Sequence, residues 1–128
     1  MPKTVFDTRF FVEHYYSKDE ATLQKTREAI RGARQRYVSA IVIHEVYYLT
    51  IQKEGRETAK LRADLLEKDF KVINVEPEIA KMSAEVRHKY KIPMADSIIA
   101  AATLSLKATC ITDDPHLKII KEIKTRWL

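Results

Sequence analysis

Short runs of β-prone residues alternate along this chain with longer segments whose apolar residues recur at helical spacing. The β-prone runs lie at residues 3–6, 37–39, 72–75, 109–112 and 123–127. A strand, a helix and a second strand in succession form a crossover unit in which the two strands are parallel. The alternation therefore predicts an α/β fold, with one domain over residues 1–128, three layers (α/β/α) and a mainly parallel central sheet.

The segments between these runs carry signals for helix boundaries. Helices are expected after residue 7, over residues 19–34, 40–54 and 57–69, from residue 77 onward and over 95–106. Gly55 is expected to end one helix and Pro77 to begin another, because glycine is common just after a helix and proline in its first turn. Segment 95–106 has almost no polar face, so it should be the most buried helix. The 57–69 helix should bury its leucines, which are Leu61, Leu65 and Leu66.

Composition limits the classes of protein to which this chain can belong. Of its 128 residues, 45% are hydrophobic, and no apolar run reaches the roughly 18 residues of a membrane-spanning helix. We therefore expect a soluble, cytoplasmic protein with no membrane partner. The net charge of +5 suits a polyanionic partner such as nucleic acid without proving one. The single cysteine, Cys110, excludes an internal disulfide and a cysteine-based zinc site, and it is expected to lie in the core.

Four acidic residues occupy positions that a parallel sheet would bring together. Asp7 follows the first predicted strand and Asp114 follows the fourth, so both should lie at the carboxyl edge of the sheet, where such folds bind ligands. Glu45 lies in the first turns of the helix after the second strand, and Asp96 lies in the first turn of the buried helix. We expect these four carboxylates to converge.

Converging carboxylates favour a cation. Like charges in a partly desolvated pocket raise one another's pKa and destabilise the metal-free protein. Oxygen ligands alone select a hard ion, so Mg²⁺ or Mn²⁺ is the expected cofactor. Such an ion lowers the pKa of a bound water and stabilises the oxygens of a phosphodiester, which predicts hydrolysis without a covalent intermediate on the enzyme.

Each acid also has an ordinary structural interpretation. Asp96 would be favoured at a helix start by the helix dipole, and Asp114 before Pro115 suits a turn. Glu45 is flanked by apolar residues, and its burial would be costly unless it is paired, metal-bound or at the rim of the core beside His44.

Four segments containing these acids resemble the signature segments of PIN-domain nucleases. They read V-F-D-T-R-F-F-V at 5–12, S-A-I-V-I-H-E-V at 39–46, M-A-D-S-I-I-A-A at 94–101 and I-T-D-D-P-H-L at 111–117. Each is weak alone, but their order and spacing resemble the family over the whole chain.

The resemblance implies a PIN-like fold and an endoribonuclease that hydrolyses RNA. It places Asp7, Glu45, Asp96 and Asp114 in the metal site, and it gives Thr112 a role in orienting that site by hydrogen bonding. By the same resemblance, Thr8 occupies a second position at which the family usually has a hydroxyl side chain. Asp113 occupies a position that varies in the family. Chains of this length resemble VapC-type toxins, which implies a small antitoxin protein as a partner and allows a homodimer.

Basic residues near these segments are candidates for contact with the substrate or a partner. Arg9 stands where the family often has serine or asparagine, and it could hold a phosphate, neutralise the acids or lie on the surface. Lys89 and Lys91 belong to a basic cluster leading to Asp96, and such a cluster is either a guide for an RNA backbone or a solvated helix face.

Other functions remain open at this point. The same chemistry fits a PIN nuclease for RNA maturation or quality control that has no antitoxin, and a degenerate chain would be a non-catalytic RNA- or partner-binding module. A receiver-like domain is disfavoured, because Asp7 has no acidic neighbour. The four histidines lack the helical spacing of a zinc hydrolase, and two glycines cannot form a phosphate-binding loop.

Overall fold

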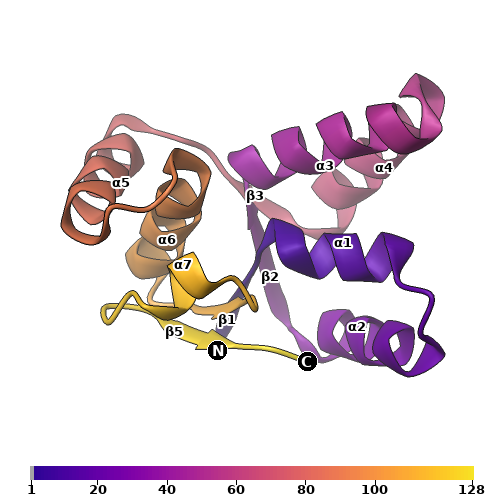
Figure 1. Cartoon of the computed structure of the whole chain (residues 1–128), viewed down its shortest axis with the longest axis horizontal. Helices are drawn as coiled ribbons and strands as arrows, with labels where there is room; N and C mark the ends of the chain where they lie inside the picture. The colour runs from indigo at the N-terminus through magenta and orange to yellow at the C-terminus, as the bar shows by residue number, and fades with distance from the viewer. Residues whose placement is uncertain (1) are drawn as a thin grey trace.

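A five-stranded parallel sheet forms the centre of the protein in a computed structural model that describes residues 2–128 (Figure 1). The strand order is β3-β2-β1-β4-β5, and every neighbouring pair is parallel. The predicted α/β fold is confirmed, with a sheet that is wholly rather than mainly parallel. The strands are β1 (Lys3–Phe6), β2 (Gln35–Ser39), β3 (Lys71–Ile73), β4 (Thr109–Ile111) and β5 (Lys124–Arg126).

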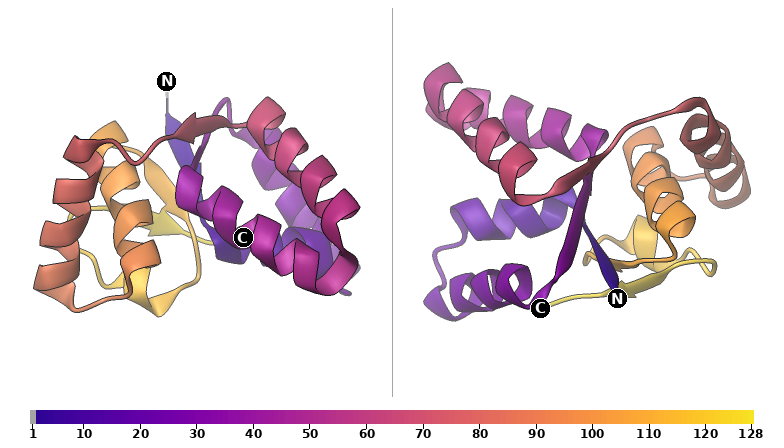
Figure 2. Two further views of the ribbon diagram at one scale, coloured as in Figure 1. Left: turned by 90° about the horizontal axis from the view of Figure 1, so that it is seen from above. Right: turned by 180° about the vertical axis from the view of Figure 1, so that it is seen from behind.

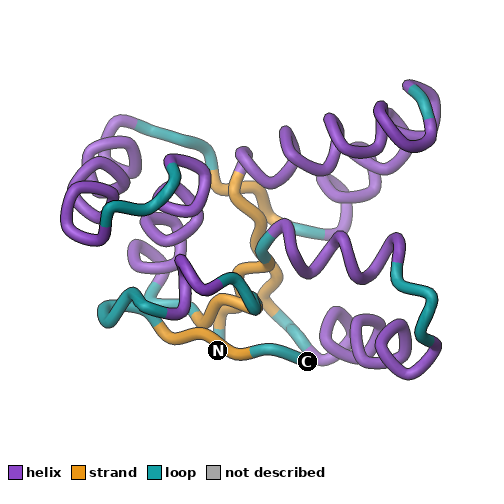
Figure 3. The backbone as a smooth tube through the Cα atoms, viewed as in Figure 1, coloured by secondary structure: helices purple, strands orange, loops and turns teal. Residues whose placement is uncertain are grey.

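Helices cover both faces of this sheet, as Figure 2 shows from two further sides. On one side lie α1 (Thr8–Tyr16), α2 (Glu20–Gly32), α3 (Ala40–Glu54) and α4 (Arg56–Asp69). On the other lie α5 (Pro77–Tyr90), α6 (Met94–Leu106) and the short α7 (Pro115–Lys118). The strands therefore form the middle layer of the molecule (Figure 3). None of the helices in the described chain is both long and apolar enough to cross a bilayer.

Phenylalanine rings form the centre of the core between the sheet and α1. Phe6 is fully buried at the end of β1, and its ring centroid lies 4.8 Å from that of Phe10 and 5.2 Å from that of Phe70, both in edge-to-face geometry. Phe11 packs edge-to-face on Phe70 at 5.4 Å. Such pairs add stability beyond the apolar area that they bury. The aromatic residues of β1 and α1 therefore fix the first helix against the sheet.

The most buried helix is α6, as its sequence predicts. Every residue from position 97 to position 103 is buried, including Ser97 and Thr103. Their hydroxyl groups donate to the carbonyl oxygens of Met94 and Ile99, so neither hydroxyl is buried without a partner. Cys110, in the adjacent β4, is also fully buried, as expected.

Helix α4 differs from the sequence prediction in the face that it buries. Leu61 and Leu65 are 61% and 47% exposed, and Leu66 alone of the three leucines is buried. The reason is that α4 is an outer helix that packs mainly on α3. The stripe that faces α3 contains small residues, Ala59 and Ala63, which allow the helices to approach closely.

The ends of the predicted strands and helices differ from the observed ones by no more than two residues. The third strand ends at Ile73, and Val75 lies in the following loop, 43% exposed, because β3 is an edge strand that pairs with β2 over three positions only. The sequence analysis did not predict α7, since Asp114 before Pro115 was interpreted as a turn. Asp114 caps this helix and Pro115 begins it, which is a combination that favours a helix start.

Truncation of Phe6 tests the aromatic core. Phe6→Ala should lower the free energy of unfolding by about 3–5 kcal/mol, because it leaves a cavity among three other rings. The control is Tyr48→Ala, since Tyr48 is 58% exposed and its loss should change stability by no more than about 0.5 kcal/mol. Urea unfolding followed by circular dichroism measures both, and equal losses would contradict this description of the core.

Candidate metal centre

The register of the sheet places Asp7 and Thr112 level with each other at its carboxyl edge. Phe6 is the partner of Ile111 across β1 and β4, and the next residue on each strand follows directly. The backbone N–H of Asp7 donates to the carbonyl oxygen of Ile111 at 3.2 Å, which holds the two strand ends together. The Asp7 and Thr112 side chains therefore meet where the parallel strands end.

The Asp7 carboxyl group is enclosed by protein and only 2% exposed. It caps α1, with one oxygen accepting from the backbone N–H of Thr8 at 2.7 Å. The other oxygen accepts from the hydroxyl of Thr112 at 2.6 Å. The same hydroxyl oxygen accepts from the backbone N–H of Asp114 at 3.0 Å, so Thr112 links two of the four acids.

Glu45 reaches the same edge from α3. Its carboxylate accepts a hydrogen bond from the hydroxyl of Thr8 at 2.6 Å. Ser39 ends β2 and caps α3, and this fixes the direction in which the helix leaves the sheet. Two carboxylates of the site therefore each accept a hydrogen bond from a threonine hydroxyl: Glu45 from Thr8, and Asp7 from Thr112.

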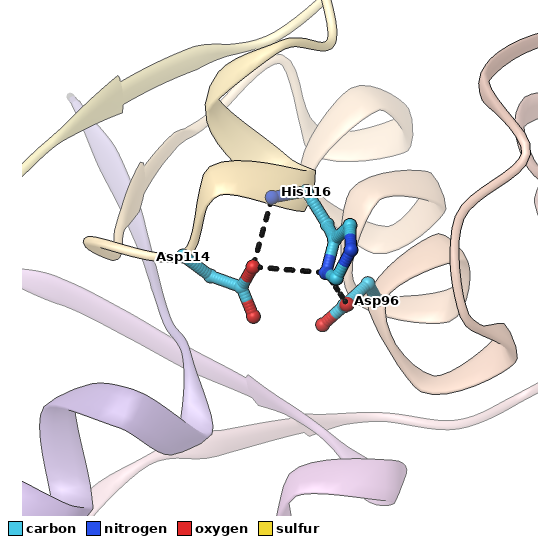
Figure 4. Close-up of side chains that lie close together, drawn as sticks. All are labelled: Asp96, Asp114 and His116. Carbon is cyan, nitrogen blue, oxygen red and sulfur yellow. Dashed lines mark hydrogen bonds and ion pairs between the residues drawn. The ribbon is translucent and has the colours of Figure 1, made fainter.

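Asp96 and Asp114 both approach the same nitrogen of the His116 ring, as Figure 4 shows. Asp96 comes from the first turn of α6 and Asp114 from the cap of α7. The Nδ1 atom of His116 lies 3.2 Å from Oδ2 of Asp96 and 3.2 Å from Oδ1 of Asp114. The three side chains offer ligand atoms that all lie within 4.8 Å of one another.

The pKa values show that the acids interact electrostatically. Burial is the main cause that raises the pKa of Asp7 to about 7, and the charges of Asp96 and Asp114 add to it, against the hydrogen bonds from Thr112 and Thr8. Burial followed by the charge of Asp114 raises the pKa of Asp96 to about 6, with Glu45 adding to the rise and His116 opposing it. We call Asp7, Glu45, Asp96 and Asp114 the acidic centre.

The donor atoms of the acidic centre fit a hard divalent cation. Carboxylate oxygens dominate, and Mg²⁺ and Mn²⁺ bind through a few carboxylates while keeping water in their other positions. Two of the acids hold raised pKa values, and a nearby positive charge would lower them again. His116 adds one nitrogen donor, which the sequence analysis did not include among the candidate site residues. The only local feature of the sequence that pointed to this role of His116 was its position two residues after Asp114.

The basic candidates do not pair with the acidic centre. Arg9 forms two hydrogen bonds with Asp113, from Nε at 3.0 Å and from Nη2 at 3.3 Å, and it lies 3.9 Å from Glu13. Lys89 pairs with Glu122 at 2.9 Å on the surface. Lys91 ends α5 in the left-handed conformation, with its ammonium 3.5 Å from the His88 ring.

Residues 4–123 match the PIN domain family. The chain belongs to that family. Among proteins with curated descriptions, none matches this sequence significantly. The PIN domain family is typically one of metal-dependent nucleases, and the acidic centre of this PIN domain is consistent with such a site.

Solved structures with the same fold include components of toxin–antitoxin complexes. The PIN domain aligns with DNA-bound VapBC from Salmonella typhimurium with a TM-score of 0.79 and 16% identity, over 99% of this chain and 98% of that one. VapBC2 from Rickettsia felis, bound to a promoter DNA fragment, gives 0.78 and 16%, over 98% of each chain. VapC20 from Mycobacterium tuberculosis, described as a toxin that cleaves the sarcin–ricin loop, gives 0.75 and 17%, over 95% and 99%.

The raised pKa of Asp7 predicts that the metal-free protein loses stability as pH rises. A carboxyl whose pKa is 3.8 in the unfolded chain and about 7 in the folded one binds its proton more tightly when folded. Its stabilising contribution is complete below pH 3.8 and is lost as pH rises through about 7, a change on the order of 4 kcal/mol. Asp7→Asn has no such proton to lose, so it should be more stable than the wild type at about pH 8.

Urea unfolding in EDTA at about pH 5 and about pH 8 measures this difference. The matched control is Asp64→Asn, which changes an exposed carboxylate of α4 and should keep the pH dependence of the wild type. The same pH dependence in Asp7→Asn and in the wild type would contradict the raised pKa.

Proposed function

We propose that this PIN domain is a metal-dependent endoribonuclease that hydrolyses RNA at the acidic centre, and that it acts as a VapC-type toxin. One observation carries the catalytic part of the proposal. Asp7, Glu45, Asp96 and Asp114 come from four separate elements and meet at one edge of the sheet, where two of them have raised pKa values. A fold keeps carboxyl groups buried and close together at a cost in stability, and functional sites are where that cost is most often found.

The side chains divide into those that would hold the ion and those that orient them. Asp7, Asp96 and Asp114 would bind Mg²⁺ or Mn²⁺, and the bound ion would acidify a water and stabilise charge on the scissile phosphate. Thr112 fixes the direction of the Asp7 carboxylate through its hydroxyl, as Thr8 fixes that of Glu45. Glu45, held in this way, would orient the attacking water.

Water is the nucleophile in this proposal, because the centre lacks a reactive protein nucleophile. Burial strongly raises the pKa of the Cys110 thiol, which is wholly inside the core, so it does not form a thiolate at neutral pH. The hydroxyls of Thr8 and Thr112 both donate to carboxylates of the centre. Phosphodiester hydrolysis would then proceed in one displacement, without a covalent intermediate on the enzyme.

Cleavage of RNA tests the catalytic proposal. Labelled single-stranded and structured RNA should be cut with Mg²⁺ or Mn²⁺ and left intact with EDTA. Asp96→Asn should lower the rate at least about 100-fold, because it removes a charged oxygen ligand from the ion. Asp64→Asn, on the exposed face of α4, should cut at the rate of the wild type. Cutting by Asp96→Asn at the wild-type rate would refute the acidic centre as the reaction site.

The toxin role is supported by the fold neighbours and by exposed apolar side chains on α3 and α4. The neighbours include chains solved as VapBC complexes, and a toxin of that kind needs a surface for its antitoxin. Tyr48 of α3 and Leu61 and Leu65 of α4 are 58%, 61% and 47% exposed. Exposed apolar side chains of this size are typical of partner surfaces, and they would suit a small antitoxin or a second copy of this chain.

Expression in a bacterial host tests the toxin role. Wild-type protein should arrest growth, Asp96→Asn should not, and co-expression of the small protein encoded beside it should restore growth. A nuclease for RNA maturation or quality control is the alternative function. It predicts that the purified protein cleaves RNA, that its expression does not arrest growth and that no inhibitory protein is encoded beside it. That result would overturn the toxin assignment while leaving the nuclease assignment intact.

A further inference from the structure

His116 lies beside two residues of the acidic centre, in the same segment as Asp114, but the proposed function gives it no role. It occupies the first turn of α7, and its side chain is 51% exposed. The ring turns its Nδ1 atom toward both Asp96 and Asp114, at 3.2 Å from one oxygen of each (Figure 4). One nitrogen therefore faces the same point as two carboxylates.

The backbone fixes His116 relative to Asp114. The Asp114 carboxylate caps α7 by accepting from the backbone N–H of His116 at 2.8 Å. The next residue, Leu117, is fully buried and anchors the short helix to the core. Asp114 is held in turn by the hydrogen bond from its own N–H to Thr112. The imidazole is thus attached to the acidic centre through a rigid turn and not through a flexible loop.

The spacing of the three donor atoms suits neighbouring positions around one ion. An octahedral ion with ligands at about 2.1 Å places adjacent ligand atoms roughly 3.0 Å apart. The two distances from Nδ1 of His116 to carboxylate oxygens are both 3.2 Å. Small adjustments of the side chains would bring all three atoms onto a common ion.

We propose that Nδ1 of His116 is a direct ligand of the divalent ion at the acidic centre, and that this nitrogen makes the site prefer Mn²⁺ to Mg²⁺. The inference rests on the proposed metal site and names a ligand beyond its carboxylates. Mg²⁺ is bound almost wholly by oxygen, whereas Mn²⁺, as a first-row transition ion, also accepts an imidazole nitrogen as a ligand. Replacing one oxygen position with nitrogen therefore favours Mn²⁺.

A simple ion pair is the competing interpretation, and it predicts the opposite result. If His116 only neutralised Asp96 and Asp114 as a cation, it would compete with a metal ion for them. Its removal would then strengthen the binding of both Mg²⁺ and Mn²⁺. If Nδ1 is a ligand, its removal weakens the binding of Mn²⁺ and changes that of Mg²⁺ far less.

Metal titration of the purified protein distinguishes these cases without any substrate. Mn²⁺ binding is measured from the electron paramagnetic resonance signal of the free ion, and Mg²⁺ binding by calorimetry. His116→Gln should weaken Mn²⁺ binding by about tenfold or more and Mg²⁺ binding by less than about threefold. The control is His44→Gln, since His44 is an exposed imidazole of α3 next to Glu45, and both affinities should stay at wild-type values.

Spectroscopy of the bound ion gives a direct test of the nitrogen ligand. Electron spin echo modulation from ¹⁴N should be present in the Mn²⁺-loaded wild type and in His44→Gln, and absent in His116→Gln. Wild-type protein with Mn²⁺ bound and no ¹⁴N modulation overturns the inference even if the variant fails to fold. Tighter binding of both ions by His116→Gln also overturns it.

Asp96→Asn separates failure of this inference from failure of the metal site itself. If that variant loses Mn²⁺ binding while His116→Gln keeps it, His116 is not a ligand and the acidic centre still is the metal site. If the wild type binds neither Mn²⁺ nor Mg²⁺ at millimolar concentrations, the inference and the proposed metal-dependent function both fall.

Discussion

The carboxyl group of Asp7 has to be satisfied without water, and the arrangement of the sheet edge depends on that constraint. Burial of an unpaired carboxyl would be costly, so the N–H of Thr8 and the hydroxyl of Thr112 take the place of solvent. Providing both donors requires that α1 begin directly after β1 and that β4 end level with it. The same register carries Asp114 to the edge, so the hydrogen bonds that stabilise Asp7 also assemble the centre.

Two threonine hydroxyls give the centre rigidity in the absence of an ion. Thr112 binds Asp7 and Thr8 binds Glu45, and each threonine follows a strand end or begins a helix that packs against the core. Repelling carboxylates on flexible side chains would separate into solvent. Here Asp7 and Glu45 are held in place by bonds from backbone and hydroxyl groups, so burial and the neighbouring charges raise the pKa of Asp7 instead of separating the carboxylates.

The sequence was sufficient for features that depend on local pattern and strand order. Alternating strands and helices predict parallel strands, and parallel strands place Asp7 and Asp114 at one edge, so the meeting of these acids could be expected before any coordinates. The exposure of Leu61 and Leu65 could not, because it depends on α4 packing against α3 rather than against the sheet. The contact of His116 with Asp96 joins residues twenty positions apart through a helix start that was interpreted as a turn. Side-chain direction across such a distance is set by tertiary packing and leaves no local signal.

The single thiol of the chain lies in the middle of this sheet. Cys110 is paired with Val5 across β1 and β4, wholly inside the core. Oxidants and alkylating reagents in the surrounding solution therefore have no route to it while the strands stay paired. The rate at which such a reagent labels Cys110 therefore measures how often β4 separates from its neighbouring strands. This measurement needs no engineered probe.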